Sequence, residues 1–91
     1  MKWRKKPVVV DAWPVDHLLA DCGTNWKGLP QEVRDAYDKG GWVFGTNEIH
    51  IPTLEGTMIA GRTDFLIRGV KGEFYPCKRD IFLATYDQAE E

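Results

Sequence analysis

Short apolar runs of strand length, separated by reversals that mostly contain glycine, form the clearest pattern in the chain. Residues 48–51 alternate strictly, so Ile49 and Ile51 fall on one face of a strand and Glu48 and His50 on the other. The same reasoning predicts strands at 42–44, 57–60, 65–67 and 73–75, with reversals at 45–47, 54–56, 61–64 and 69–72. Residues 65–67 are apolar on both faces, which predicts a central strand covered by a helix.

A first strand is predicted over residues 5–13. The valine run 8–10 is β-branched and favours extended backbone. Pro7 has no N–H donor, so it belongs at the beginning or at an edge of a strand. Trp13 and Pro14 are expected to end it.

Two helices are predicted after this strand. The first covers residues 16–23, where Asp16 is expected to cap the start and Gly23 to close the end in the left-handed conformation. The second begins at Pro30, which suits a first helical position, and stops at Gly40-Gly41. The loop at 24–28 between them carries Trp26.

The end of the chain is predicted to form a short helical turn at 78–82 and a last strand at 83–86. Together these elements predict an α+β domain with a mostly antiparallel sheet of about six short strands and two short helices inserted after the first strand. At 91 residues the chain is expected to be a single domain, 1–91.

Composition narrows the function classes without choosing one. The formal charge of −2 and a pI near 5.6 make nucleic-acid binding an unfavoured expectation. No apolar run approaches the ~20 residues that cross a bilayer and no signal peptide is evident, so a cytoplasmic location is predicted. Cys22 and Cys77 are expected to be free thiols, with a disulfide as the alternative. So small a core makes homo-oligomerisation an option.

The residues predict no catalytic group, metal or cofactor. The histidines and cysteines at 17, 22, 50 and 77 lack the spacing of a zinc site. Cys77 is followed by Lys78 and Arg79 at the start of a helical turn, where a thiolate would be favoured, but a structural role at a bend is the preferred interpretation. Nothing in the sequence pairs two carboxylates for acid–base chemistry.

The reversal at 69–72 is the candidate ligand site. Gly69 and Gly72 are expected to let backbone N–H groups approach a phosphate, and Arg68 can grip its oxygens in a bidentate way. The predicted ligand-binding set is Arg68, Gly69, Lys71, Gly72, Phe74 and Tyr75, in which one ring would stack on a base. Alternatively, the segment is only a hairpin with a solvated arginine.

A second candidate surface would bind a partner protein. Trp26 is expected to be partly exposed, and Arg4 and Lys5 belong to a basic run, residues 2–6, that interleaves a tryptophan with cations. The predicted partner-binding set is therefore Trp26, Arg4 and Lys5. The basic run can also be a solubilising N-terminal arm.

The segment from Leu54 to Tyr86 resembles the small bacteriophage and prophage proteins of the PGDYG family. The resemblance rests on residues 54–58, 67–77, 80–82 and 84–86, and the opening 4–10 is similar to the usual start of such proteins. At 62–65 this chain has Arg-Thr-Asp-Phe where the family name implies Pro-Gly-Asp and an aromatic residue, so its Pro-Gly turn is missing. The resemblance implies a phage genome as the source and carries no established enzymatic activity.

Three functions follow as hypotheses. The first is a non-enzymatic phage accessory protein that binds and sequesters a nucleotide-derived immune signal in the host cytoplasm. The second is a protein–protein inhibitor of a host defence or replication enzyme. The third is a small nucleotide-degrading enzyme. The partner is thus predicted to be a nucleotide-like molecule or a host protein.

Overall fold

The computed structural model describes residues 1–4 and 7–88, and these form six strands and four helical segments. The strands are β1 (Asp11–Pro14), β2 (Val43–Phe44), β3 (Glu48–Thr53), β4 (Gly56–Gly61), β5 (Phe65–Arg68) and β6 (Phe74–Cys77). The helices are α1 (Val15–Thr24), the short 3-10 helix η1 (Trp26–Gly28), α2 (Gln31–Asp38) and α3 (Arg79–Thr85).

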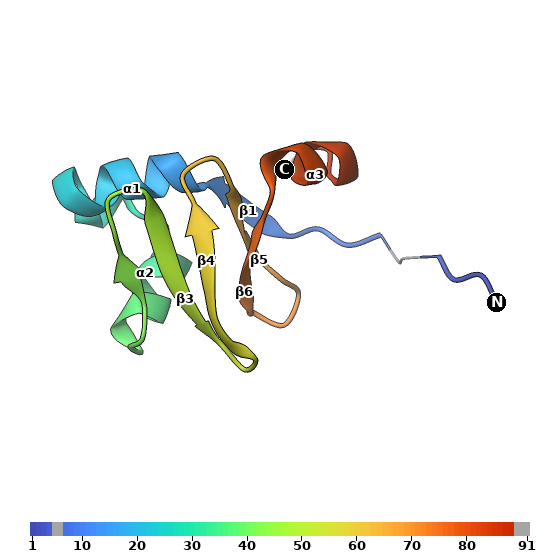
Figure 1. Cartoon of the computed structure of the whole chain (residues 1–91), viewed down its shortest axis with the longest axis horizontal. Coiled ribbons are helices and arrows are strands. Elements are labelled where there is room, and N and C mark those ends of the chain that lie inside the picture. Colours follow the sequence, from blue (N-terminus) through green and yellow to red (C-terminus); the bar gives the residue numbers. More distant parts are fainter. Residues whose placement is uncertain (5–6, 89–91) are drawn as a thin grey trace.

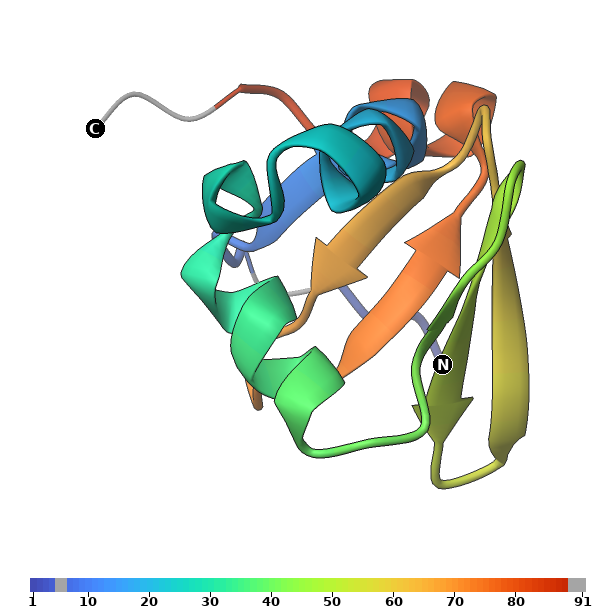
Figure 2. The same ribbon diagram turned by 90° about the vertical axis from the view of Figure 1, so that its left-hand side faces the viewer.

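The strands form two antiparallel sheets of three, in the orders β1-β5-β6 and β2-β3-β4 (Figure 1). The predicted α+β class is therefore confirmed, and the strands that the sequence placed in one sheet are divided between two. β4 lies beside β6, so the two sheets meet along these strands. Figure 2 shows α1 and α2 in front of the strands and α3 behind α1.

The core lies between the sheets and the first two helices. Ile49 and Ile51 are fully buried, as their alternation with Glu48 and His50 predicts. Leu66 from β5 and Val33 from α2 join the same cluster and have no exposed surface. Burial of these side chains is the main favourable term for so short a chain.

Strand β5 is covered on both faces, as predicted for residues 65–67. Leu66 belongs to the core cluster, while Ile67 points to the opposite face and is 1% exposed. Phe65 stacks there on Phe82 of α3, with ring centroids 4.1 Å apart. β5 is central because β1 and β6 pair with it on either side.

The predicted last strand at 83–86 is wrong, because α3 continues through Thr85. Phe82 stacks on Phe65 and also on Tyr86, at 5.1 Å between ring centroids. The Thr85 hydroxyl donates to the carbonyl of Ile81, one helical turn earlier, over 2.7 Å. The helix therefore extends to Thr85, three residues beyond the predicted helical turn, and ring contacts lie along one side of it.

The predicted first strand begins later than expected. β1 starts at Asp11, which pairs with Arg68, and Arg68 is the last residue of β5. Residues before Asp11 have no β5 backbone opposite them, and Val8 and Val9 are 42% and 78% exposed. Of the predicted strand, Lys5 and Lys6 lie outside the described residues.

Both predicted helices form, but α1 has different ends and α2 begins at Gln31, one residue after the predicted start at Pro30. Asp16 lies inside the first turn of α1 instead of capping it, and the first N–H, of Val15, donates to the carbonyl of Asp64 over 2.9 Å. Gly23 lies within the helix, which ends at Thr24 and is followed by Asn25 as its C-cap, and Gly23 does not have a positive φ, so its predicted closing role is wrong. α2 follows Pro30 and ends before Gly40 and Gly41, which have φ of +100° and +89°.

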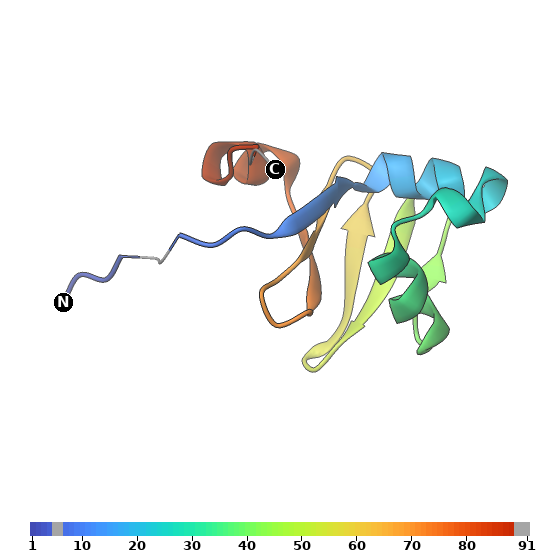
Figure 3. The ribbon, with the colours of Figure 1, turned by 180° about the vertical axis from the view of Figure 1, so that it is seen from behind.

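The chain before β1 extends away from the body on the side opposite α2 (Figures 1 and 3). We call its described parts, residues 1–4 and 7–10, the N-terminal arm. The arm contributes to a longest dimension of 46 Å, against 30 and 22 Å in the other directions. Within the described residues, no helix has the length and apolar character needed to span a bilayer.

Candidate functional site: a cleft over Trp42

A cleft of about 770 Å³ lies between three segments that are distant in sequence. One wall comes from α2 and the residues after it, another from the β3–β4 hairpin, and the third from the β5–β6 hairpin. Trp42 lines the cleft and is 8% exposed. We call this concavity the Trp42 cleft, and its volume is in the range of small-molecule sites.

Glycines set the backbone around the cleft. Gly40 and Gly41, both at positive φ, reverse the chain after α2 and lead into Trp42. A Cβ at Gly41 would lie 2.9 Å from the Pro52 side chain, so only glycine fits between α2 and the β3–β4 hairpin. Gly72 has φ of +84°, and a Cβ there would lie 3.4 Å from a terminal guanidinium nitrogen of Arg68.

Two core aromatic rings give the cleft its apolar surface. Trp42 and Phe74 meet edge to face, with ring centroids 5.1 Å apart. Phe74 also stacks on Trp13 at 6.4 Å and packs against the core cluster. Because these rings pack on the core, the apolar surface of the cleft is in place before a ligand binds.

Carboxylates outnumber cations in the cleft. Glu32 and Asp35 of α2, Glu55 of the β3–β4 hairpin and Glu73 of the β5–β6 hairpin contribute four carboxylates, against Lys39 and Arg68. The Arg68 guanidinium lies 4.0 Å from a carboxylate oxygen of Asp11, which further offsets its charge. The field in the cleft therefore favours a neutral or cationic group over an anion.

The structure brings together four of the six predicted ligand-binding residues. Arg68, Gly72, Phe74 and Tyr75 line the Trp42 cleft. Gly69 does not line it, and Lys71 is exposed outside it. These four residues thus belong to one wall of a larger concavity.

The predicted phosphate-cradling role of the glycine N–H groups is not supported. The Gly69 N–H donates to the carbonyl of Glu73 over 2.7 Å, and the Gly72 N–H donates to the carbonyl of Gly69 over 2.9 Å. A Cβ at Gly69 would overlap the Glu73 carboxylate, which therefore lies against this backbone. The two donors close the reversal itself, and a carboxylate occupies the space beside it.

Tyr75 lies on the other face of β6 from Phe74. It pairs with Ile67 on the side that α3 covers. Burial raises the pKa of Tyr75 to about 12, with further contributions from a side-chain hydrogen bond with Tyr86 and from the nearby Glu73 charge. Its phenol is therefore a neutral structural group at physiological pH.

Of the predicted partner-binding residues, the structure describes Trp26 and Arg4, and these lie in separate parts of the fold. Trp26 is 36% exposed, as expected, but its ring packs edge to face on Tyr37 at 4.8 Å and on Phe44 at 5.7 Å. Arg4 is exposed on the N-terminal arm, and Lys5 lies outside the described residues. Trp26 therefore has a packing role in addition to any contact with a partner.

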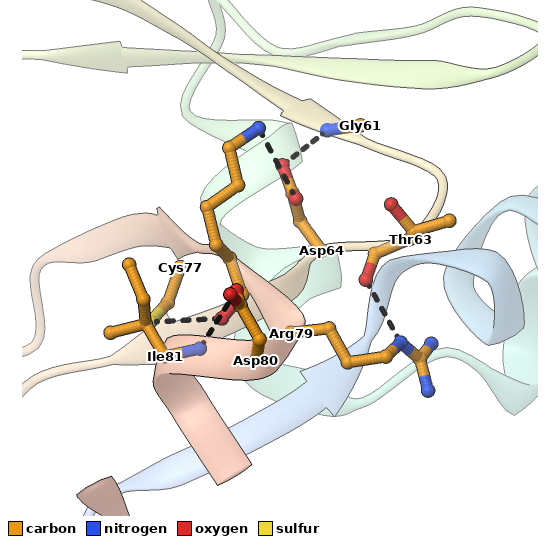
Figure 4. A network of polar contacts seen from close by, with 8 residues as sticks. Gly61, Thr63, Asp64, Cys77, Arg79, Asp80 and Ile81 are labelled. Atoms are coloured by element: carbon orange, nitrogen blue, oxygen red, sulfur yellow. Dashed lines mark hydrogen bonds and ion pairs between the residues drawn. The ribbon is translucent and has the colours of Figure 1, made fainter. Parts of the chain in front are cut away.

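Cys77 lies in a network that disfavours its thiolate (Figure 4). Its pKa is raised, first by burial and then by the Asp64 and Asp80 carboxylates. These carboxylates outweigh the neighbouring cations on which the nucleophile hypothesis rested. A raised pKa suits the structural role that the sequence favoured.

Asp64 organises this network as a structural residue. It is 4% exposed, and one carboxylate oxygen accepts the Gly61 N–H over 2.8 Å while the other lies 3.7 Å from Lys78 Nζ. Arg79 ties α3 to the same turn by donating to the Thr63 carbonyl over 3.0 Å (Figure 4). Within residues 1–4 and 7–88, no three His, Cys, Asp or Glu side chains gather as a metal site would require.

Sequence reasoning missed the residues that α2 and the β3–β4 hairpin bring to the cleft. Glu32, Asp35 and Lys39 carry the ordinary signal of a solvated helix face, and Glu55 that of a turn. Only the folded arrangement places them around Trp42. Comparisons of the chain with protein-family models, with curated proteins and with solved structures found no match.

Proposed function

We propose that this is a non-enzymatic binding protein that holds a basic, ring-bearing segment of a partner polypeptide in the Trp42 cleft. The observation that carries the proposal is the excess of carboxylates around an apolar surface made by Trp42 and Phe74. Such a surface suits an aromatic side chain flanked by lysine or arginine, whose charges meet Glu32, Asp35, Glu55 and Glu73.

The proposed setting comes from the resemblance to PGDYG-family phage proteins. In that setting the partner is a host defence or replication enzyme in the cytoplasm of an infected cell, and occupation of the cleft inhibits it. The raised pKa of Cys77 supports binding over catalysis, because a nucleophilic cysteine needs a stabilised thiolate.

Peptide titration tests this proposal. Ten-residue peptides containing Lys-Trp-Arg are titrated into the protein by calorimetry, and the same peptides with Glu in place of Lys and Arg serve as controls. We expect only the basic peptides to bind.

Variants of the protein test the same charge preference. Glu55→Lys should weaken binding about tenfold or more, whereas Asp38→Lys, the same charge change on an α2 residue outside the cleft, should have little effect. Equal binding of both peptide sets would exclude the cleft's charge as the recognition element.

Sequestration of a nucleotide-derived signal is a second candidate, favoured by one observation. Arg68 is half-buried beside Phe74, so a guanidinium and an aromatic ring lie together in a cleft of suitable volume. Calorimetry with cyclic nucleotides and ADP-ribose derivatives tests it, followed by heating to recover the ligand unchanged. Arg68→Ala should abolish this binding and Lys71→Ala should spare it. Recovery of a cleaved nucleotide would favour the enzyme hypothesis instead.

A further inference from the structure

The N-terminal arm carries side chains that complement the Trp42 cleft, namely an exposed ring and positive charges. Trp3 is 87% exposed and stands between two exposed cations, Lys2 and Arg4. Burying the ring of so exposed an indole against another surface would be favourable in free energy. The arm therefore supplies an unburied ring and two positive charges within three residues.

The cleft is complementary to this triplet in both respects. It offers an apolar surface at Trp42 and Phe74, and its carboxylates exceed its cations. We propose that the Lys2-Trp3-Arg4 segment of a second copy of this chain occupies the Trp42 cleft. This inference rests on the binding preference proposed above and names the chain itself as one source of the ligand.

The direction of the arm favours a second copy over the same molecule. The arm leaves the body at Asp11 and runs away from α2, which forms one wall of the cleft (Figures 1 and 3). Arg4 lies seven residues before Asp11, and extended chain of that length spans roughly 24 Å. An arm of this reach can cross to a neighbouring molecule without reversing its direction.

Two-fold symmetry makes the exchange reciprocal. Each copy gives one arm and receives one, so the same contact forms twice in a closed dimer. A bound arm also blocks the cleft, so dimerisation and capture of a partner polypeptide compete. The free monomer is then the form that binds the partner, and dilution of the protein favours this monomer over the dimer.

Sedimentation velocity across a range of protein concentrations tests the proposal. At low ionic strength we expect a concentration-dependent shift from monomer to dimer, weakened several-fold or more by physiological salt because opposite charges meet at the contact. Trp3→Ala should leave the protein monomeric over the same range. Val9→Ala, which truncates another exposed arm residue away from the triplet, should dimerise like the wild type.

A charge-swap mixture separates arm exchange from loss of folding. Arg4→Glu and Glu55→Lys should each impair self-association at least tenfold, whereas the matched controls Lys27→Glu and Asp38→Lys should not. Mixing Arg4→Glu protein with Glu55→Lys protein should restore dimers, because the altered arm meets the altered cleft and the unaltered arm meets the unaltered cleft.

The outcomes also separate this inference from the proposed function. A protein that stays monomeric at all concentrations while binding basic peptides overturns arm exchange and leaves the proposed function standing. A dimer that is insensitive to Trp3→Ala and to Glu55→Lys overturns arm exchange as well, because its interface lies elsewhere. Failure of both dimerisation and peptide binding removes the two proposals together.

Discussion

At the scale of single residues, burial and two nearby carboxylates together disfavour the thiolate of Cys77. The sequence places Lys78 and Arg79 beside it, but folding brings the Asp64 and Asp80 carboxylates near enough to raise its pKa further. Asp80→Asn removes one of these charges and retains an oxygen that can accept the Ile81 N–H. We therefore expect Asp80→Asn to lower the pKa of Cys77 and to speed its alkylation by iodoacetamide.

The measurement is the alkylation rate as a function of pH in a Cys22→Ser background, so that one thiol reacts. Asp38→Asn, an exposed α2 carboxylate outside this network, is the control and should leave the rate profile unchanged. A profile that stays fixed in Asp80→Asn would show that the Asp80 charge does not contribute to the pKa of Cys77, which burial and Asp64 would then set.

Tyr75 makes stability depend on pH in the alkaline range. Its pKa is about 12 in the folded protein against 10.0 for an ordinary tyrosine. Between these values the unfolded chain releases a proton that the folded protein retains, so the free energy of unfolding falls as pH rises from about 10 to about 12. Chemical denaturation at several pH values should show a shallower decline in Tyr75→Phe, and an identical decline would contradict this assignment.

At the scale of elements, α3 packs on the sheet through the ring of Phe82 and is also tied by the Arg79 hydrogen bond to Thr63. None of its residues is fully buried, and Phe82 connects it to the sheet through the Phe65 stack at 4.1 Å. Phe82→Ala should destabilise the protein by about 1–3 kcal/mol. It should also increase amide exchange in residues 79–85 more than in β3, because α3 can detach while the core persists.

Leu83→Ala is the matched control, since Leu83 lies in the same helix and is 61% exposed. Its effect should stay within about 0.5 kcal/mol. Uniform loss of protection in β3 and α3 after Phe82→Ala would mean that the helix unfolds only with the whole domain.

The elements also differ in how far the sequence could predict them. The alternation of β3 was predictable, because the face of a strand residue is a local property. The reversals at Gly56 and Gly72 were predictable too, because both glycines adopt a positive φ that glycine tolerates best. Residues 83–86 were not, since a run as short as Leu-Ala-Thr-Tyr fits either a helix or a strand and the Phe65–Phe82 stack decides between them.

One wall of the cleft was predictable, because Arg68 and its neighbours belong to a single hairpin. Glu32 and Glu55 could not be assigned to the cleft, because only tertiary packing brings α2 and the β3–β4 hairpin beside that wall.

At the scale of the whole molecule, one cluster joins both sheets and two helices. Leu66 has no exposed surface and packs with residues of β3, α1 and α2. Leu66→Ala should cost about 2–5 kcal/mol, measured as the free energy of unfolding in urea. Ile59→Ala on β4 removes an aliphatic side chain that is 55% exposed, and it should cost less than about 1 kcal/mol. Similar costs for the two would mean that the cluster is not the centre of stability.

The Trp42 cleft combines exposed rim side chains, which can be substituted, with rings that pack against the core. Its rim residues Glu55 and Glu73 are exposed, whereas Trp42 and Phe74 beneath them pack with the cluster that holds the domain together. Exchanging rim side chains should therefore change the charge and shape of the cleft while the architecture is retained. Glu55 and Glu73 are therefore the natural positions for a randomised library that keeps the fold and varies the surface of the cleft.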